Sequence, residues 1–178
     1  MRQLAKKLNM KVTTAKAPFS EPGDSGIEVR PLGVRVISVL DLTADVLKRS
    51  GIERGMRVLD LGCGSGDTSL LIAKMVGASG LVVGVDKSAE AIDKAEKCAT
   101  IAGRCYWTRF VKADPETFVP PERFDAVVVR QSLLRQGQPA TFQRLSPYVR
   151  PDGVIMVSSA SLAANADSIL HRMSRLSS

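Results

Sequence analysis

The sequence has few of the residues on which several classes of protein depend. Among its 178 residues are three cysteines, one histidine and one tryptophan. The cysteines (Cys63, Cys98 and Cys105) are odd in number and lack C-x-x-C spacing, which argues against a disulfide framework and a zinc ribbon. No apolar run approaches the roughly 20 residues that span a bilayer, and the first residues do not form a secretory signal. We therefore expect a cytoplasmic protein without a metal site or membrane contact.

Acidic residues are missing from the first 20 positions, which hold five basic side chains. The formal net charge is +7, but the other 158 residues are nearly balanced, with 20 basic and 18 acidic side chains. A turn-rich stretch over residues 20–26 follows, so residues 1–26 are expected to be a basic tail and linker. A solvated extension is the simpler interpretation, and a tail that steers the protein toward an acidic surface is the alternative.

Apolar residues recur at helical spacing between Pro31 and about Arg49. Pro31 suits the first position of a helix, and Gly51 suits its exit. β-branched residues are frequent in this stretch and weaken helix propensity, so packing would have to hold the helix in place. We predict an N-terminal helix, acting as a lid, over residues 27–50.

From residue 56 onward, short apolar runs alternate with helical patterns. The expected strands are residues 56–61, 81–85, 106–111, 124–129 and 153–157, and the expected helices are 68–76, 88–102, 139–145 and 161–176. Apolar strands that alternate with helices indicate a parallel sheet covered on both faces. The fold class is therefore α/β, with one domain over residues 51–178.

The first expected strand leads into a glycine cluster, Gly62, Gly64 and Gly66. Glycines at alternate positions let the backbone turn sharply and let a ligand approach it closely. A plain strand-to-helix turn would need only one or two. Because ligands of doubly wound sheets bind beyond the carboxyl ends of the strands, this cluster is a candidate ligand loop.

Carboxylates indicate which ligand suits the loop. Asp60 and Asp67 flank it and would repel a pyrophosphate, and Asp67 stands where a dinucleotide loop has its last glycine. Asp86 and Asp114 follow the next two strands. Asp86 can accept hydrogen bonds from ribose hydroxyls, since Ser88 can cap the helix that follows. The pattern favours a nucleoside with a cationic end.

Over residues 30–158 the chain resembles the class I S-adenosylmethionine-dependent methyltransferases, above all their small-molecule group. The resemblance rests on the runs VLDLGCGSGDTSL, GVDKS, KADPETF, FDAVVVRQSLL and LSPYVRPDGVIMV. It implies a Rossmann-like three-layer sandwich with a mostly parallel, doubly wound sheet, and S-adenosyl-L-methionine as cofactor with S-adenosyl-L-homocysteine as product. The family's usual last two strands are expected to be lacking. Strand five would then be an exposed edge and a surface for a homodimer.

The resemblance also implies a role for each site residue. The glycine loop would contact the methionine part of the cofactor, Asp86 the ribose hydroxyls and Asp114 the adenine amino group. Lys87 and Pro115 would line the adenine pocket, and Arg130 would pair with the methionine carboxylate. The expected cofactor-binding residues are Asp60, Gly62, Cys63, Gly64, Gly66, Asp86, Lys87, Asp114, Pro115 and Arg130.

The leading function is methyl transfer to a small-molecule acceptor by in-line displacement. One alternative is a non-catalytic, cofactor-binding regulatory protein with an incomplete acceptor site. Another is an RNA methyltransferase that uses the basic tail, although nucleic acid is not the expected partner. No catalytic base stands out, because Glu116, Asp125 and His171 have no supporting pattern. Solvated helix and loop charges are the simpler interpretation of four arginines, and a preference for an anionic acceptor is the alternative: Arg130, Arg135, Arg144 and Arg150.

Overall fold

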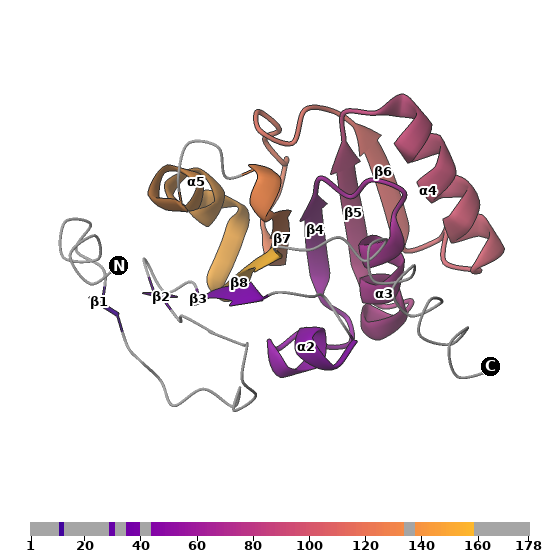
Figure 1. Ribbon diagram of the computed structural model, residues 1–178. Helices are drawn as coiled ribbons and strands as arrows, with labels where there is room; N and C mark the ends of the chain where they lie inside the picture. The colour runs from indigo at the N-terminus through magenta and orange to yellow at the C-terminus, as the bar shows by residue number, and fades with distance from the viewer. Residues whose placement is uncertain (1–10, 13–28, 31–34, 40–43, 134–137, 159–178) are drawn as a thin grey trace, which may run out of the picture.

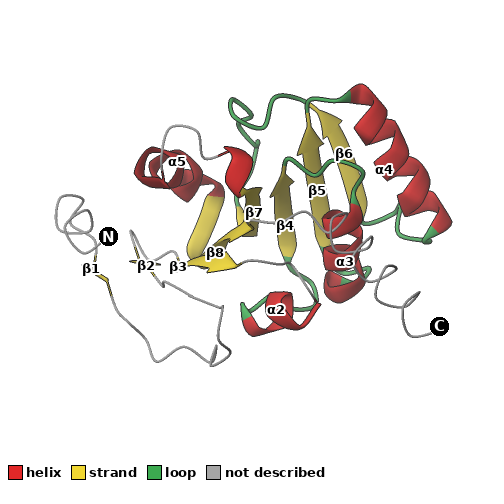
Figure 2. Ribbon diagram, in the orientation of Figure 1, coloured by secondary structure: helices red, strands yellow, loops and turns green. Residues whose placement is uncertain are grey.

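The computed structural model describes residues 11–12, 29–30, 35–39, 44–133 and 138–158 (Figure 1). These residues contain one sheet of eight strands in the order β1-β2-β3-β8-β7-β4-β5-β6 (Figure 2). The strands are β1 (Lys11–Val12), β2 (Val29–Arg30), β3 (Arg35–Val39), β4 (Arg57–Leu61), β5 (Leu81–Asp86), β6 (Thr108–Lys112), β7 (Phe124–Arg130) and β8 (Val149–Ser158).

Five strands form the parallel, doubly wound part of the sheet, in the order β6-β5-β4-β7-β8. The sequence-based prediction of an α/β, Rossmann-like fold is confirmed, and each of the five expected strands is present. The connecting helices are α3 (Asp67–Val76), α4 (Ala89–Ile101) and α5 (Gln138–Leu145), with short 3-10 turns η1 (Gln131–Leu133) and η2 (Ser146–Tyr148). Because these strands are parallel, their carboxyl ends lie at one edge of the sheet, toward which the arrowheads of β4, β5 and β6 point in Figure 1.

Alternate residues of β4, β5, β7 and β8 pack into two cores, one on each face of the sheet. Val58 of β4 belongs to the core formed with α3 and with α2 (Ala44–Arg49). The next residue, Leu59, belongs to the core on the other face, formed with Phe142 and Leu145 of α5. Helix α4 lies against β5 and β6. Helices therefore cover both faces, as a three-layer sandwich requires.

The prediction of an N-terminal helix is wrong for the first part of that stretch. Arg35–Val39 is not helical but forms β3, which pairs in parallel with β8 from Arg35↔Val154 to Val39↔Ser158. Only Ala44–Arg49 is helical in this stretch. Three of the five β3 residues are β-branched, and a neighbouring strand satisfies their backbone groups, so the strand conformation is preferred. The division into segments 1–26, 27–50 and 51–178 otherwise stays a prediction.

The exposed edge expected at strand five is also absent. That strand, β8, lies between β7 and β3. A homodimer through this edge would have to displace β3, so the surface proposed for it does not exist in the described sheet. The helix expected over residues 161–176, and any strand after β8, lie outside the described residues. Among the residues described, no helix has the length and apolar character needed to cross a bilayer.

Candidate functional site

The register of the sheet brings the predicted carboxylates to one edge. Asp60 lies one residue before the end of β4, and Asp86 is the last residue of β5. Asp86 pairs with Lys112, the last residue of β6, and Asp114 follows two residues later. Arg130 ends β7 on the other side of β4. The structure therefore brings together the four side chains that the sequence placed at strand ends.

Backbone hydrogen bonds hold the glycine loop against the end of β5. The amides of Gly62 and Cys63 both donate to the Val85 carbonyl, at 2.8 and 3.1 Å. The amide of Gly64 donates to Oδ2 of Asp86 at 2.9 Å, and the amide of Gly66 donates to the Cys63 carbonyl at 3.1 Å. The loop thus has a fixed shape that the protein itself supplies.

Each glycine of the loop has a positive φ, of 80° at Gly62, 54° at Gly64 and 84° at Gly66. A Cβ at Gly62 would lie 2.9 Å from Leu133 Cδ1, and one at Gly66 would lie 2.9 Å from Ala95 Cβ. Packing therefore requires glycine at position 66, whereas at position 62 the end of the Leu133 side chain could move and the positive φ is the stronger reason. A Cβ at Gly64 would lie 3.1 Å from Nη2 of Arg130, so this glycine keeps backbone and guanidinium close.

Asp60 is buried, and its Oδ2 accepts a hydrogen bond from the Ser69 hydroxyl at 2.6 Å. Burial raises the pKa of Asp60 from 3.8 to about 6, while the Ser69 hydrogen bond and the positive charge of Arg130 act in the opposite direction. The negative charge of Asp86 adds to the increase. Asp60 therefore links the end of β4 to the first turn of α3, and its side chain does not line an open surface.

Asp86 is half-buried and uses both carboxylate oxygens within the protein. Oδ2 accepts from Gly64, and Oδ1 accepts from the Ser88 amide at 3.0 Å. Ser88 itself caps α4, as expected, with its hydroxyl accepting from the Ala91 amide. A carboxylate offers about four lone-pair sites, so two remain for donors such as sugar hydroxyls. The neighbouring Lys87 is exposed.

The segment after β6 carries Asp114 and Pro115. The Asp114 side chain is exposed, and its Oδ1 accepts from the Glu116 amide at 2.9 Å. The Asp114 carbonyl accepts from the amide of Phe118 at 2.9 Å, so the segment turns tightly here. Pro115 is buried, and its carbonyl accepts from Nη1 of Arg144 at 3.3 Å.

Cys63 is buried within the loop, near the position that a Cβ on Gly84 would take, 3.0 Å from its Sγ. Burial, and then the nearby carboxylates of Asp60 and Asp86, raise the pKa of the Cys63 thiol well above its usual range. A protonated, buried thiol is a poor nucleophile. Any contribution of Cys63 to ligand binding therefore comes from its backbone.

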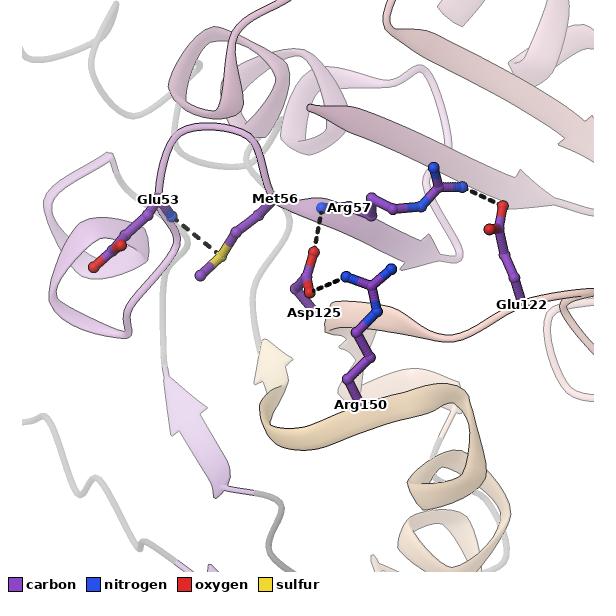
Figure 3. Close-up of polar contacts among 6 residues, drawn as sticks. All are labelled: Glu53, Met56, Arg57, Glu122, Asp125 and Arg150. Atoms are coloured by element: carbon purple, nitrogen blue, oxygen red, sulfur yellow. Dashed lines mark hydrogen bonds and ion pairs between the residues drawn. The ribbon is translucent and has the colours of Figure 1, made fainter. Parts of the chain in front are cut away.

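The four arginines that suggested an anionic acceptor do not form one group. Arg130 donates to the Cys63 carbonyl at 3.4 Å, beside the glycine loop. Arg150 pairs with Oδ1 of Asp125 at 2.7 Å, and Asp125 also accepts from the Arg57 amide (Figure 3). Because Asp125 and Arg57 lie at the beginnings of β7 and β4, this cluster is at the opposite edge of the sheet. Arg150 therefore lies away from the predicted acceptor site. Arg135 lies outside the described residues.

Sequence reasoning did not identify Ser69 as part of the site. The feature that could have identified it is its position in α3, where it lies on the buried side with Ile72, Ala73 and Val76. A hydroxyl on a buried helical face requires a hydrogen-bond partner, and the partner is Asp60. The role of Arg144 toward Pro115 was also missed, because 29 residues separate the two and the pattern of the chain gives no sign of the contact.

Comparison with known proteins shows the family. The chain matches the Methyltransferase domain family over residues 52–177 and belongs to it. It is 36% identical over 104 residues to the probable cobalt-precorrin-6B C(15)-methyltransferase of Thermoplasma acidophilum, covering 58% of this chain and 48% of that protein. It is 30% identical over 121 residues to phosphoethanolamine N-methyltransferase 1 of Arabidopsis thaliana, covering 67% of this chain and 24% of that protein. The chain thus spans less than half the length of these two relatives.

Solved structures agree on the fold. A SAM-dependent methyltransferase of Thiobacillus denitrificans, solved in complex with S-adenosyl-L-homocysteine, is 26% identical with a TM-score of 0.55, over 64% of this chain and 46% of that one. A SAM-dependent methyltransferase of Aquifex aeolicus is 27% identical with a TM-score of 0.52, over 60% of this chain and 57% of that one. These findings confirm the family recognised from the sequence and S-adenosylmethionine as the cofactor of that family.

Proposed function

We propose that this chain binds S-adenosylmethionine across the carboxyl ends of β4, β5 and β6 and transfers its methyl group to a small-molecule acceptor. The observation that carries the proposal is the hydrogen bond between Gly64 and Asp86, which joins a glycine loop to a carboxylate that still has free acceptor sites. Family membership supplies the chemistry that this geometry supports.

The residues present suit the parts of that cofactor. Asp86 would accept hydrogen bonds from both ribose hydroxyls, and hydrogen bonds to a charged partner are worth about 1.5–3 kcal/mol each. Asp114 would accept from the adenine amino group, with Pro115 and Lys87 beside the ring. The Gly62–Gly66 loop would face the methionine part, and the Arg130 guanidinium would pair with its carboxylate.

The bound cofactor would supply an activated methyl group, and the protein would supply its orientation. Holding two reacting groups in line can lower a barrier by about 7–11 kcal/mol. The fixed shape of the glycine loop serves this role, because the loop does not have to become ordered when the ligand binds. A general base would be needed only if the acceptor loses a proton during the attack.

The acceptor would lie beyond the carboxyl ends of β7 and β8, next to Arg130. Several relatives act on small molecules by name, among them phosphoethanolamine N-methyltransferase 1 of Arabidopsis thaliana and the 2-phytyl-1,4-naphtoquinone methyltransferase of Synechococcus elongatus. Arg130 would favour an acceptor that carries an anionic group near the methyl, although Arg150 would not contribute to it.

Calorimetric titration with S-adenosylmethionine, S-adenosylhomocysteine and NAD tests the site. Micromolar binding of the first two and none of NAD is expected. Asp86→Ala should abolish binding, while Asp93→Ala, which replaces an exposed carboxylate on α4, should leave it unchanged. Equal affinity in both variants would reject the site.

A screen of small-molecule acceptors with radiolabelled cofactor then tests catalysis. Methyl transfer to a small molecule supports the proposed activity. Cofactor binding without transfer to any acceptor would favour a regulatory, non-catalytic protein. Transfer to RNA that depends on residues 1–20 and weakens steeply with salt would favour the RNA alternative.

A further inference from the structure

Arg144 connects two elements that are distant in the sequence. It lies in the last turn of α5, is half-buried, and donates from Nη1 to the carbonyl of Pro115 at 3.3 Å. Pro115 belongs to the segment between β6 and β7, which runs along the top of the sheet toward α5 in Figure 1. The contact therefore joins the segment that carries Asp114 to a helix on one face of the sheet.

The segment after β6 has other connections, within it and at its ends. Within it, the Glu116 amide donates to Oδ1 of Asp114 at 2.9 Å. On one side, the Ala113 amide donates to the Asp86 carbonyl at 3.0 Å. On the other side, Phe118 packs against the core that contains Leu145 of α5. Residues 113–123 include neither helix nor strand, so the direction of Asp114 depends on individual contacts such as these. Arg144 is the anchor nearest to Pro115 that comes from a different element.

The carbonyl of Pro115 follows Asp114 by one residue, and Pro115 is itself buried. Proline restricts the φ of its own residue and the conformation of the residue before it. Fixing the Pro115 carbonyl therefore limits the directions in which the Asp114 carboxylate can point. The charged guanidinium of Arg144 supplies the donor to this carbonyl, at 3.3 Å.

We infer that Arg144 is a positioning residue for adenine recognition: through the Pro115 carbonyl it orients Asp114 toward the adenine amino group. This inference rests on the proposed function, because it assigns that group to Asp114. Arg144 does not touch the ligand in this account. Its effect is on the relative affinity of the site for different purine bases.

The test compares two ligands that differ only at the purine. S-adenosylhomocysteine carries the 6-amino group, and S-inosylhomocysteine carries an oxygen in its place. The wild-type chain should bind S-adenosylhomocysteine at least tenfold more tightly than S-inosylhomocysteine. With the second ligand the Asp114 carboxylate would have no amino donor and would face an oxygen instead. In Arg144→Ala this preference should fall toward one, because affinity for S-adenosylhomocysteine decreases more than affinity for S-inosylhomocysteine. Arg144→Lys, which keeps one charged donor, should restore part of the preference.

The control is Arg150→Ala, which removes an arginine from the opposite edge of the sheet and should leave the preference unchanged. A general loss of stability would weaken both ligands equally, so a constant ratio in Arg144→Ala and Arg144→Lys would overturn the inference. If Arg144→Ala does not fold, the ratio in Arg144→Lys decides. Failure of the wild-type chain to bind S-adenosylhomocysteine would instead reject the proposed function, and equal wild-type affinity for both ligands would reject the role of Asp114 and the inference with it.

Discussion

Oδ2 of Asp86 accepts a hydrogen bond from the Gly64 amide at 2.9 Å, so the last residue of β5 holds the middle of the loop that follows β4. A carboxylate expected to bind a ligand is therefore also a structural part of the loop. The same side chain accepts from the Ser88 amide at the beginning of α4. Substitutions of Asp86 should affect loop order and ligand binding to different extents.

Asp86→Asn and Asp86→Ala should separate these two roles. An asparagine carbonyl oxygen can still accept from Gly64, so the exchange of that amide with solvent should stay slow. Affinity for S-adenosylhomocysteine should nevertheless fall about tenfold, because the charge is lost. In Asp86→Ala the Gly64 amide should exchange faster and binding should disappear. Amide exchange by NMR and calorimetry measure the two effects, and equal exchange in both variants would show that Asp86 does not hold the loop.

Gly66→Ala should destabilise the fold by roughly 3 kcal/mol. The alanine would have to adopt a φ of 84°, which residues with a side chain rarely do. Its Cβ would lie 2.9 Å from Ala95 Cβ and 3.2 Å from the Phe110 ring. A left-handed conformation costs about 1–2 kcal/mol, and overpacking adds about 1–3 kcal/mol. The measurement is urea unfolding.

Gly103→Ala is the matched control for that variant. Gly103 also has a positive φ, of 65°, but a Cβ there would meet no atom within 4 Å. Only the conformational cost of about 1–2 kcal/mol should remain. Similar losses in the two variants would contradict the close packing of α4 and β6 against the loop.

Asp60 should make stability decrease as pH rises from about 4 to 6. Its pKa is about 6 in the folded chain and 3.8 in the unfolded one, so in this interval the folded state binds more protons than the unfolded state. The free energy of unfolding therefore falls as pH rises, by about 2–3 kcal/mol between pH 4 and pH 7, and changes little above pH 7. Asp60→Asn removes this contribution. The difference in unfolding free energy between variant and wild type should shift by about 2–3 kcal/mol in favour of the variant between pH 4 and 7, and a constant difference would contradict the burial of the charge.

Ile37→Pro tests the pairing of β3 with β8. Proline removes a backbone donor and fits poorly inside a sheet, so β3 should separate from its neighbour. Amides in Val154–Val157, which lie opposite β3, should then exchange faster by mass spectrometry, while those of β5 should not change. Ile37→Val keeps the strand preference and serves as the control. Unchanged exchange in β8 would show that the pairing contributes nothing to its protection.

The parallel part of the fold could be predicted because its signals are local. Most of its strands contain a short apolar run, and Gly62, Gly64 and Gly66 mark the first turn into a helix. Asp86 could be placed for the same reason, since it directly follows an apolar run and Ser88 is available as a cap.

Strand β3 could not be predicted in the same way. Val36 and Val39 fit a helical spacing and also a strand, and the partner that decides between the two is β8, distant in the sequence. The bond between Arg144 and Pro115 likewise depends on tertiary packing. The separation of Arg150 from the other arginines required knowledge of the edge at which β8 begins.

The pairing of β3 with β8 also affects how the chain can fold during synthesis. Arg35 pairs with Val154, so about 120 residues separate the partners. The ribosome releases β3 before any other parallel strand, but its neighbour is made last among them. Strands β4, β5 and β6 can associate before β8, the partner of β3, has been synthesised. Contacts between segments as distant as β3 and β8 form slowly. The first parallel strand to leave the ribosome is thus among the last to enter the sheet, and until then its backbone is open to chaperones and to other chains.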